Sequence, residues 1–255
     1  MVLMDCHVHL DNKELDDFVA SQDACPKDFR IKMISNSVDV DSSRRNLKLA
    51  KTLDNVIPFV GIHPEVFLNP QYADVSLEFL NEQLQCIFEL IQGSSGIGEI
   101  GLDQKYGAFE KQVHVFERQL EAAEKWEKPI SLHSRGEVPK IIEILSTVKL
   151  VKGVLFHWFA GTESELHKLM NLGYFVSFGP TILNSKSRAG LLKGADLELF
   201  LAETDSPLHF GSAFREVPIT PFAITSILFS MALKLQMRYD DIVVVNEQNA
   251  KRFLG

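Results

Sequence analysis

Eight short apolar runs, separated by longer amphipathic segments, constrain what this chain can fold into. The runs are rich in apolar and β-branched residues, as buried strands are. In the segment 109–128, Val113, Phe116, Leu120 and Ala123 recur at the three- and four-residue spacing of a helix. The runs cover residues 2–10, 31–38, 56–64, 96–103, 129–135, 153–161, 174–180 and 197–205.

Near-continuous apolar strands joined through helices are typical of parallel sheets. Eight strand–helix units predict that the sheet closes into a (β/α)₈ barrel, or TIM barrel, of the α/β class. A doubly wound open sheet is the competing architecture. The chain has no Gly/Ser/Pro-rich linker, charge block or internal repeat, and its 255 residues suit one barrel. We therefore predict a single domain over residues 1–255.

The net charge limits the kind of partner that the chain can bind. A formal charge of −8 at pH 7 and a pI near 5.5 mean that the molecule as a whole repels anions. Broad clamping of a nucleic-acid backbone is therefore disfavoured. Bound divalent ions could still make a local pocket positive.

The cysteines and the apolar segments allow a prediction of the cellular compartment. Cys6, Cys25 and Cys86 are odd in number and form no CxxC pair, which predicts reduced thiols and a cytoplasmic location. Asp5 precedes any long apolar run, so we expect no secretory signal. In 219–235 polar residues recur every four positions, which predicts a half-buried helix and no membrane span.

Histidines and acids lie where the predicted strands end. The C-terminal ends of barrel strands meet at one face, and that face carries the active site. Alternation along the first strand turns His7 and His9 inward and Val8 toward the helices. The residues at strand ends are His7, His9, His63, Glu99, His133, His157 and Asp205.

Two of these residues are carboxylates in apolar surroundings. Glu99 stands among glycines and apolar residues in GIGEIGLD, where a carboxylate is costly to bury unless it is paired or bound to a metal. Asp205 ends an apolar strand, and its alternative role is to cap a helix that begins near Pro207. Together with four of the histidines at the strand ends, these acids suit a divalent cation such as Zn²⁺, Mn²⁺ or Mg²⁺.

Six short motifs, in register along the chain, carry a family resemblance. They are HVHLD, GIHP, GEIGLD, HSR, HWFAG and ETDSP, and the chain ends in NEQNAKRFLG. In this order, at these strand ends, they resemble the TatD family of metal-dependent hydrolases within the amidohydrolase superfamily. Many superfamily members bridge two metals with a carboxylated lysine. Here Glu99 stands at that position, as in the TatD pattern.

The resemblance implies a site for two divalent metal ions, with Zn, Mn and Mg as candidates. The implied ligands are His7, His9 and Asp205 for one ion, His133 and His157 for the other, and Glu99 as the bridge. Asp205 and Glu99 are the implied catalytic residues. Asp205 would act as the general base toward a metal-activated water.

Two further residues are predicted to bind the substrate. His63 could position or polarise the scissile group, or it could be a structural histidine of a His-Pro turn. Arg135 could hold a phosphate through two parallel hydrogen bonds, or it could form an ordinary exposed ion pair. Aromatic residues in the predicted mouth loops, Tyr106, Trp158 and Phe159, could stack on bases, with core packing the alternative for Phe159.

The resemblance implies hydrolysis of phosphodiester bonds in DNA, with nucleotides removed from strand ends in the manner of a 3′–5′ exonuclease. The alternative is hydrolysis of a non-phosphate ester or amide, such as the ester of a D-aminoacyl-tRNA. A non-enzymatic interaction protein on the same barrel is a third hypothesis, which the presence of all six implied ligands disfavours. DNA ends are the expected partner, and we infer no obligate protein partner. The QKYG segment and the short first loop, 11–32, leave substrate preference open.

Overall fold

The structure, a computed structural model, describes residues 2–25, 30–69, 72, 75–211 and 215–255. Within them, eight strands form one sheet in which each strand pairs in parallel with the next along the chain. The strands are β1 (Met4–Val8), β2 (Lys32–Ser35), β3 (Val56–Val60), β4 (Gly96–Gly101), β5 (Ile130–His133), β6 (Val154–Phe156), β7 (Phe175–Phe178) and β8 (Phe200–Ala202).

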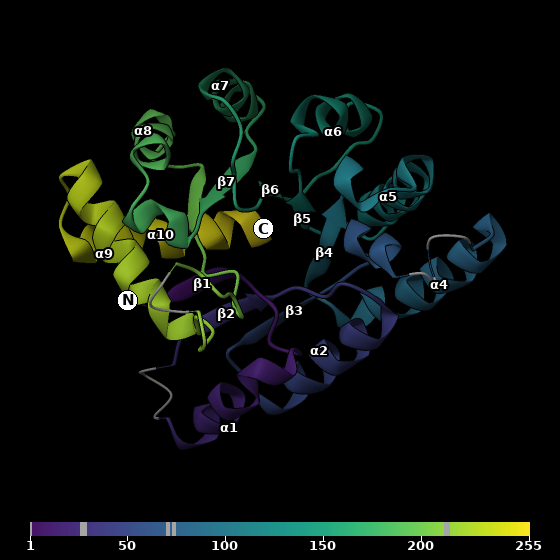
Figure 1. The fold of residues 1–255 in the computed structure, drawn as a ribbon, viewed down its shortest axis with the longest axis horizontal. Coiled ribbons are helices and arrows are strands. Elements are labelled where there is room, and N and C mark those ends of the chain that lie inside the picture. Colours follow the sequence, from purple (N-terminus) through teal and green to yellow (C-terminus); the bar gives the residue numbers. More distant parts are fainter. Residues whose placement is uncertain (1, 26–29, 70–71, 73–74, 212–214) are drawn as a thin grey trace.

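The sheet closes on itself between its first and last strands (Figure 1). After β8, Ser206 pairs in parallel with Val8 of β1, and the His9 N–H donates a hydrogen bond to the Ser206 carbonyl. The predicted (β/α)₈ barrel is thus confirmed, and the open doubly wound sheet is wrong for this chain.

Helices surround the barrel (Figure 1). The α-helices are α1 (Asp16–Ala24), α2 (Val40–Thr52), α4 (Leu77–Leu90), α5 (Phe109–Lys125), α6 (Val138–Leu145), α7 (Glu163–Asn171), α8 (Lys186–Gly194), α9 (Ile224–Leu235) and α10 (Tyr239–Leu254). Short 3₁₀ helices are η1 (Lys13–Leu15), η3 (Pro64–Leu68), η4 (Ile91–Gly93), η5 (Gln104–Tyr106), η6 (Pro180–Leu183) and η7 (Pro221–Ala223).

Capping side chains begin two of the helices that follow barrel strands. Asp39 accepts a hydrogen bond from the Ser42 N–H, and the Ser42 hydroxyl oxygen accepts one from the Asp39 N–H, which forms a capping box before α2. Thr162 and Glu165 form the same box before α7. Because both caps follow strands, they fix loops at the C-terminal face of the barrel.

The C-terminal helix α10 packs against β1 and β8. The Asn246 side chain accepts a backbone N–H from β8 and donates to a backbone carbonyl of β1. Near the end of the helix, the Phe253 ring lies 5.9 Å from that of Phe59, centroid to centroid. The Phe59 ring fills the space beside Gly96, where an added Cβ would lie 2.3 Å from it. A glycine is therefore required at this position of β4.

The apolar segment 219–235 contains η7 and α9. Ile227, Leu228 and Met231 of α9 are buried, whereas Phe229 and Leu233 are exposed, which confirms the predicted half-buried helix. Among the described helices, none combines the length and the hydropathy that a membrane crossing needs.

Strand pairing stops before the apolar runs do. β1, β3, β6 and β8 end ahead of four predicted strand-end residues, which lie in the loops at the C-terminal face and not in strands: His9, His63, His157 and Asp205. The apolar character continues past the strands because Ile62 and Phe159 are buried within these loops. Phe159 thus packs in the core, which was the alternative to base stacking.

Candidate metal centre

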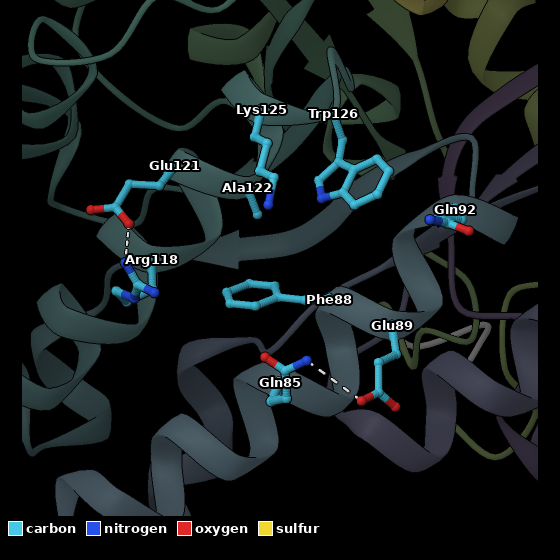
Figure 2. Close-up of a pocket in the computed structure, with 9 residues that line it drawn as sticks. All are labelled: Gln85, Phe88, Glu89, Gln92, Arg118, Glu121, Ala122, Lys125 and Trp126. Carbon is cyan, nitrogen blue, oxygen red and sulfur yellow. Dashed lines mark hydrogen bonds and ion pairs between the residues drawn. The ribbon is translucent and has the colours of Figure 1, made fainter.

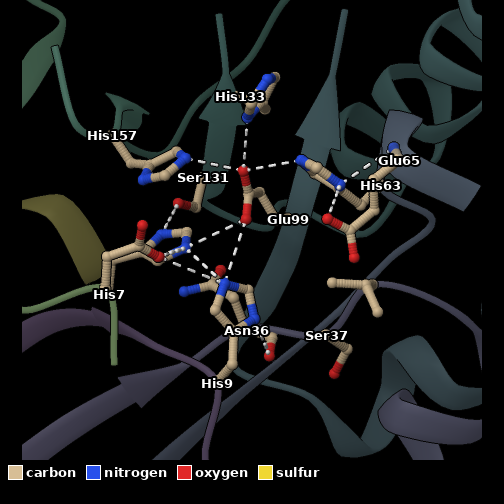
Figure 3. Close-up of polar contacts among 12 residues, drawn as sticks. His7, His9, Asn36, Ser37, His63, Glu65, Glu99, Ser131, His133 and His157 are labelled. Atoms are coloured by element: carbon tan, nitrogen blue, oxygen red, sulfur yellow. Dashed lines mark hydrogen bonds and ion pairs between the residues drawn. The ribbon is translucent and has the colours of Figure 1, made fainter. Parts of the chain in front are cut away.

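Glu99 of β4 lies in the middle of a ring of five histidines at the C-terminal face (Figure 3). Its carboxylate is buried, and each imidazole places one nitrogen close to a carboxylate oxygen. The distances to Glu99 are 3.2 Å for His7, 3.3 Å for His9, 3.0 Å for His63, 3.0 Å for His133 and 2.7 Å for His157. The fold therefore gathers five histidines from four different parts of the sequence around one acid.

Four atoms form a compact set on the Oε2 side of Glu99. His7 Nε2 and His9 Nε2 are 3.3 Å apart and lie 3.2 Å and 3.3 Å from this oxygen. The fourth atom, Asp205 Oδ1, lies 3.7 Å and 3.5 Å from the same two nitrogens. Ligands about 2.0–2.2 Å from a tetrahedral ion are roughly 3.3–3.6 Å from one another. The spacing of the His7, His9 and Glu99 atoms therefore fits a divalent cation, and Asp205 Oδ1 lies beside both histidine nitrogens.

A second group of atoms lies on the Oε1 side of Glu99. Nδ1 of His133 is 3.0 Å from Oε1, and Nε2 of His157 is 2.7 Å from it. The rings of His157 and His7 stack with centroids 3.8 Å apart, so the two groups adjoin. The clusters that could hold a metal are His7–His9–Glu99, His63–Glu99–His133 and His7–His157–Glu203, and they are consistent with a binuclear divalent metal site.

The far nitrogens of three histidines are held by neighbouring groups. The contacts are His7 Nδ1 with Ser131 Oγ at 3.0 Å, His9 Nδ1 with the Asn36 carbonyl at 3.2 Å, and His133 Nε2 with Asp103 Oδ2 at 2.9 Å. Such partners select a tautomer and orient the ring around a metal. His7 and His9 therefore face the centre through Nε2, whereas His133 faces it through Nδ1.

Glu203 is a buried carboxylate beside the centre that the sequence analysis did not identify. One of its oxygens lies 3.7 Å from His157 Nδ1. Its two oxygens accept hydrogen bonds from the Trp158 N–H at 2.7 Å and the Ser177 hydroxyl at 2.5 Å. Both oxygens of Glu203 already have donors, and His157 Nδ1 has no hydrogen-bond partner within the described residues, so Glu203 acts on His157 through its charge. Its sequence signal is its position two residues before Asp205 in the apolar run 197–205, where alternation along a predicted strand would place both acids on one face.

His63 faces Glu99 but is arranged as a hydrogen-bond donor. Its Nδ1 accepts a hydrogen bond from the Glu65 N–H, so the neutral ring carries its proton on Nε2. That nitrogen is buried, 3.0 Å from Glu99, and makes no well-aligned hydrogen bond within the described residues. An imidazole N–H aimed into the centre can donate to a substrate oxygen. His63 also caps η3, so the structural role of the His-Pro turn is present as well.

Asp205 is held by its backbone in a conformation that few residues adopt. Its φ is 53°, in the left-handed region, and its N–H donates to the His7 carbonyl at 2.9 Å. The preceding Thr204 is fixed by Asp5, which accepts hydrogen bonds from its N–H and its hydroxyl. Residues 206–211 are not helical, so the helix-cap alternative for Asp205 is wrong.

A cavity of about 1370 Å³ opens onto the centre. His63, Asp205 and Arg135 are among its lining residues. The Arg135 guanidinium lies 2.6 Å from Asp103 Oδ2 and 5.2 Å from the Tyr106 ring centroid, and its side chain is 47% exposed. Both predicted substrate-binding residues therefore border the space in which a substrate would lie, and the ion-pair alternative for Arg135 is also present.

A second hollow, of about 580 Å³, lies between α4 and α5 outside the barrel (Figure 2). Phe88 and Trp126 contribute apolar surface to it, and Arg118 pairs with Glu121 at its edge. Its described lining contains no histidine or cysteine, so it lacks the ligand types gathered around Glu99.

In the absence of a metal, protons on the histidines balance the negative charge of the acids in the centre. Burial opposes charge on Glu99, but the histidines around it, His157 foremost, hold its pKa well below the usual value. Burial likewise disfavours protonated His9, yet hydrogen bonds to Asp205 and Glu99 raise its pKa to about 10. The pKa of His157 is also raised, by Glu99 and Glu203 against the effect of burial.

We expect metal binding to release protons. The raised pKa values of His9 and His157 favour protonated imidazoles in the metal-free protein, and a metal ligand must be a neutral imidazole. Metal affinity should therefore increase as the pH rises from 6 toward the pKa of about 10. Calorimetric titration with Zn²⁺ in buffers of different ionisation enthalpy measures the released protons. A heat that does not depend on the buffer would contradict this expectation.

A closed parallel barrel with buried histidines and carboxylates at its C-terminal face defines the class of metal-dependent hydrolases. Residues 4–255 match the protein family described as TatD related DNase, and the chain belongs to this family. The predicted family is thus confirmed.

Individual relatives are similar over nearly their whole length. Human deoxyribonuclease TATDN3 is 28% identical, covering 97% of this chain and 93% of that protein. The uncharacterized metal-dependent hydrolase YabD of Bacillus subtilis is 26% identical, covering 98% of each chain. The crystal structure of the TatD homologue YjjV from Escherichia coli superimposes with a TM-score of 0.85 at 25% identity, over 98% of this chain and 97% of that one.

Proposed function

We propose that this TatD-family hydrolase cleaves phosphodiester bonds at DNA strand ends and releases nucleotides from the 3′ end. The proposed ligands are His7, His9 and Asp205 for one divalent ion, His133 and His157 for another, and Glu99 between them. The observation that carries the proposal is the group of His7, His9 and Glu99 atoms on the Oε2 side, because its spacing suits ligands of one ion and Asp205 Oδ1 lies beside both histidine nitrogens.

Divalent ions, when bound here, supply Lewis acidity that activates water and offsets charge on a phosphate. Asp205 is the proposed general base. Its side chain is partly exposed to the cavity, unlike the buried Glu99, and so can accept the proton of an attacking water. Glu99 is not suited to this role because imidazoles surround both of its oxygens.

His63 and Arg135 are proposed to hold the scissile phosphate. The Nε2–H of His63 has no well-aligned acceptor within the described part of the chain, so it can donate to a phosphate oxygen. Arg135 keeps several N–H groups free of Asp103 and can form the paired hydrogen bonds that phosphate accepts.

The charge distribution favours a strand end over a long duplex as substrate. The net charge of −8 opposes extended contact with a polyanion. The cavity lining contains three cations and six acids, so the positive charge that attracts a terminal phosphate group would come mainly from bound divalent ions. The similarity to human deoxyribonuclease TATDN3 supports DNA as the substrate.

The test compares two substrates with the metal-loaded protein. One is single-stranded DNA labelled at either end, and the other is a D-aminoacyl-tRNA. We expect nucleotides to be released from the 3′ end of DNA. Ester cleavage of the tRNA substrate without DNA hydrolysis would overturn the proposal and favour a carboxylic-ester hydrolase on the same centre. No hydrolysis of either substrate would also contradict it.

Replacing Arg135 with alanine is expected to weaken substrate binding. A charge-assisted hydrogen bond contributes about 1.5–3 kcal/mol, so KM for DNA should rise roughly 10- to 100-fold with a smaller change in kcat. Arg135→Lys keeps the charge and should recover part of the loss. Arg118→Ala, in the outer hollow, is the matched control and should behave as wild type. An unchanged KM in Arg135→Ala would remove this residue from the binding site.

A further inference from the structure

The backbone of Trp158 has an unusual conformation directly beside the metal centre. Trp158 follows His157, and its φ is 42°, a left-handed value that is costly for a bulky side chain. Its N–H donates to Glu203 at 2.7 Å and lies 3.1 Å from the Ser177 hydroxyl oxygen, and both partners are fully buried. Buried polar groups thus hold the backbone in a form that the chain would otherwise avoid.

In this conformation the Trp158 side chain lies at the wall of the cavity. Trp158 is half-buried and belongs to the lining of the space above Glu99. Its ring lies against Gly179, where an added Cβ would be 3.1 Å from two atoms of the six-membered ring. The absence of a side chain at Gly179 leaves room for the ring. The indole ring of Trp158 therefore forms an apolar surface at the side of the metal centre where His157 lies.

The other aromatic side chain of the cavity is already covered. Tyr106 lies near His63 and His133, with ring centroids 5.9 Å and 5.8 Å away, and the Arg135 guanidinium lies 5.2 Å from its ring centroid. For Trp158, the described residues provide no stacked ring, no cation over the ring and no hydrogen bond to the indole N–H. Of the two aromatic groups, Trp158 therefore has the surface that is available to a planar ligand.

We propose that Trp158 is the stacking platform for the nucleobase of the nucleotide whose ester bond lies at the metal centre. Stacking on an aromatic side chain accepts every base, because each has a π-face. The ring is held next to His157, so it would orient the terminal nucleotide while Arg135 and His63 hold its phosphate. This inference rests on the proposed function for the phosphate, but the base site itself requires only a nucleotide ligand.

A binding measurement tests the site without turnover. The chain has two tryptophans, Trp126 and Trp158, so Trp126→Phe leaves Trp158 as the only indole. Trp126 lies in the outer hollow, away from the centre. We expect dAMP to quench the fluorescence of this variant in a saturable manner, and the base-free 2-deoxyribose 5-phosphate to leave it unchanged. Absent quenching by dAMP, or equal quenching by both compounds, would overturn the proposal.

A substrate comparison tests the same site during hydrolysis. Trp158→Leu should lower kcat/KM on single-stranded DNA about 10- to 100-fold, the range expected from losing one base–aromatic stack. On DNA with an abasic 3′-terminal nucleotide, wild type and Trp158→Leu should be equal, and Trp158→Phe should retain most activity on normal DNA. Equal losses on normal and abasic DNA would indicate a structural role and overturn the proposal.

The two outcomes separate this inference from the proposed function. DNA hydrolysis that Trp158→Leu slows equally on both substrates, or does not slow, refutes the base site and leaves the phosphodiesterase intact. Saturable quenching by dAMP in a protein that does not cut DNA refutes the phosphodiesterase and retains the base site.

Discussion

Replacing Glu99 with glutamine is expected to abolish hydrolysis and to strip metal from the centre. Glu99 presents one oxygen to His7 and His9 and the other to His133 and His157. Glutamine has no charge, and its NH₂ group cannot bind a cation. A metal ion supplies several kcal/mol of transition-state stabilisation, so kcat/KM should fall on the order of 10³-fold or more. DNA hydrolysis assays and elemental metal analysis measure the two effects.

The matched control for this variant is Glu121→Gln on α5. Glu121 is an exposed acid at the edge of the outer hollow, and its replacement should change neither metal content nor turnover. Circular dichroism establishes that both variants are folded at the assay temperature. Wild-type turnover by a folded, metal-containing Glu99→Gln protein would exclude Glu99 from the centre.

Replacing Asp205 with asparagine is expected to remove turnover while one metal position survives. Asparagine keeps the size and one oxygen of the side chain but cannot accept a proton. General base catalysis contributes typically 10²–10⁴-fold, so kcat should fall by about that factor or more, since a ligand is weakened as well. The group formed by His133, His157 and Glu99 does not include Asp205, so metal should remain detectable.

Asp196→Asn is the control for this second variant because Asp196 is exposed near the opposite end of β8. Its kinetics should match those of wild type. If Asp205→Asn instead raised KM without lowering kcat, Asp205 would act in binding, and the general base would have to be another group.

Much of the fold could be predicted because the relevant signal is local. The apolar runs and the helical spacing between them identify all eight strands, and parallel pairing in chain order then follows from the number of strand–helix units. The strand ends could not be predicted, because loop residues such as Ile62 are as buried as strand residues. The hydrophobic pattern of a sequence indicates which residues are buried, and here the buried residues continue beyond the last residues that pair between strands.

The residues that face the centre could be anticipated, and those that support them could not. His7, Glu99 and Asp205 stand out because ionisable groups are rare within or at the end of apolar runs of sequence. Ser131 and Asp103 orient histidines through contacts between strands distant in sequence, which depend on barrel register. The left-handed conformation of Trp158 likewise could not be predicted from the sequence, because glycine is the residue that usually adopts this conformation.

The most direct test of the account is hydrolysis of 3′-labelled single-stranded DNA by chelator-treated protein, before and after addition of Zn²⁺, Mn²⁺ or Mg²⁺. We expect no release of nucleotides from the metal-free protein and recovery with at least one of the three ions, in proportion to the number of ions bound per chain. Equal release before and after metal addition, or no release with any ion, would contradict it.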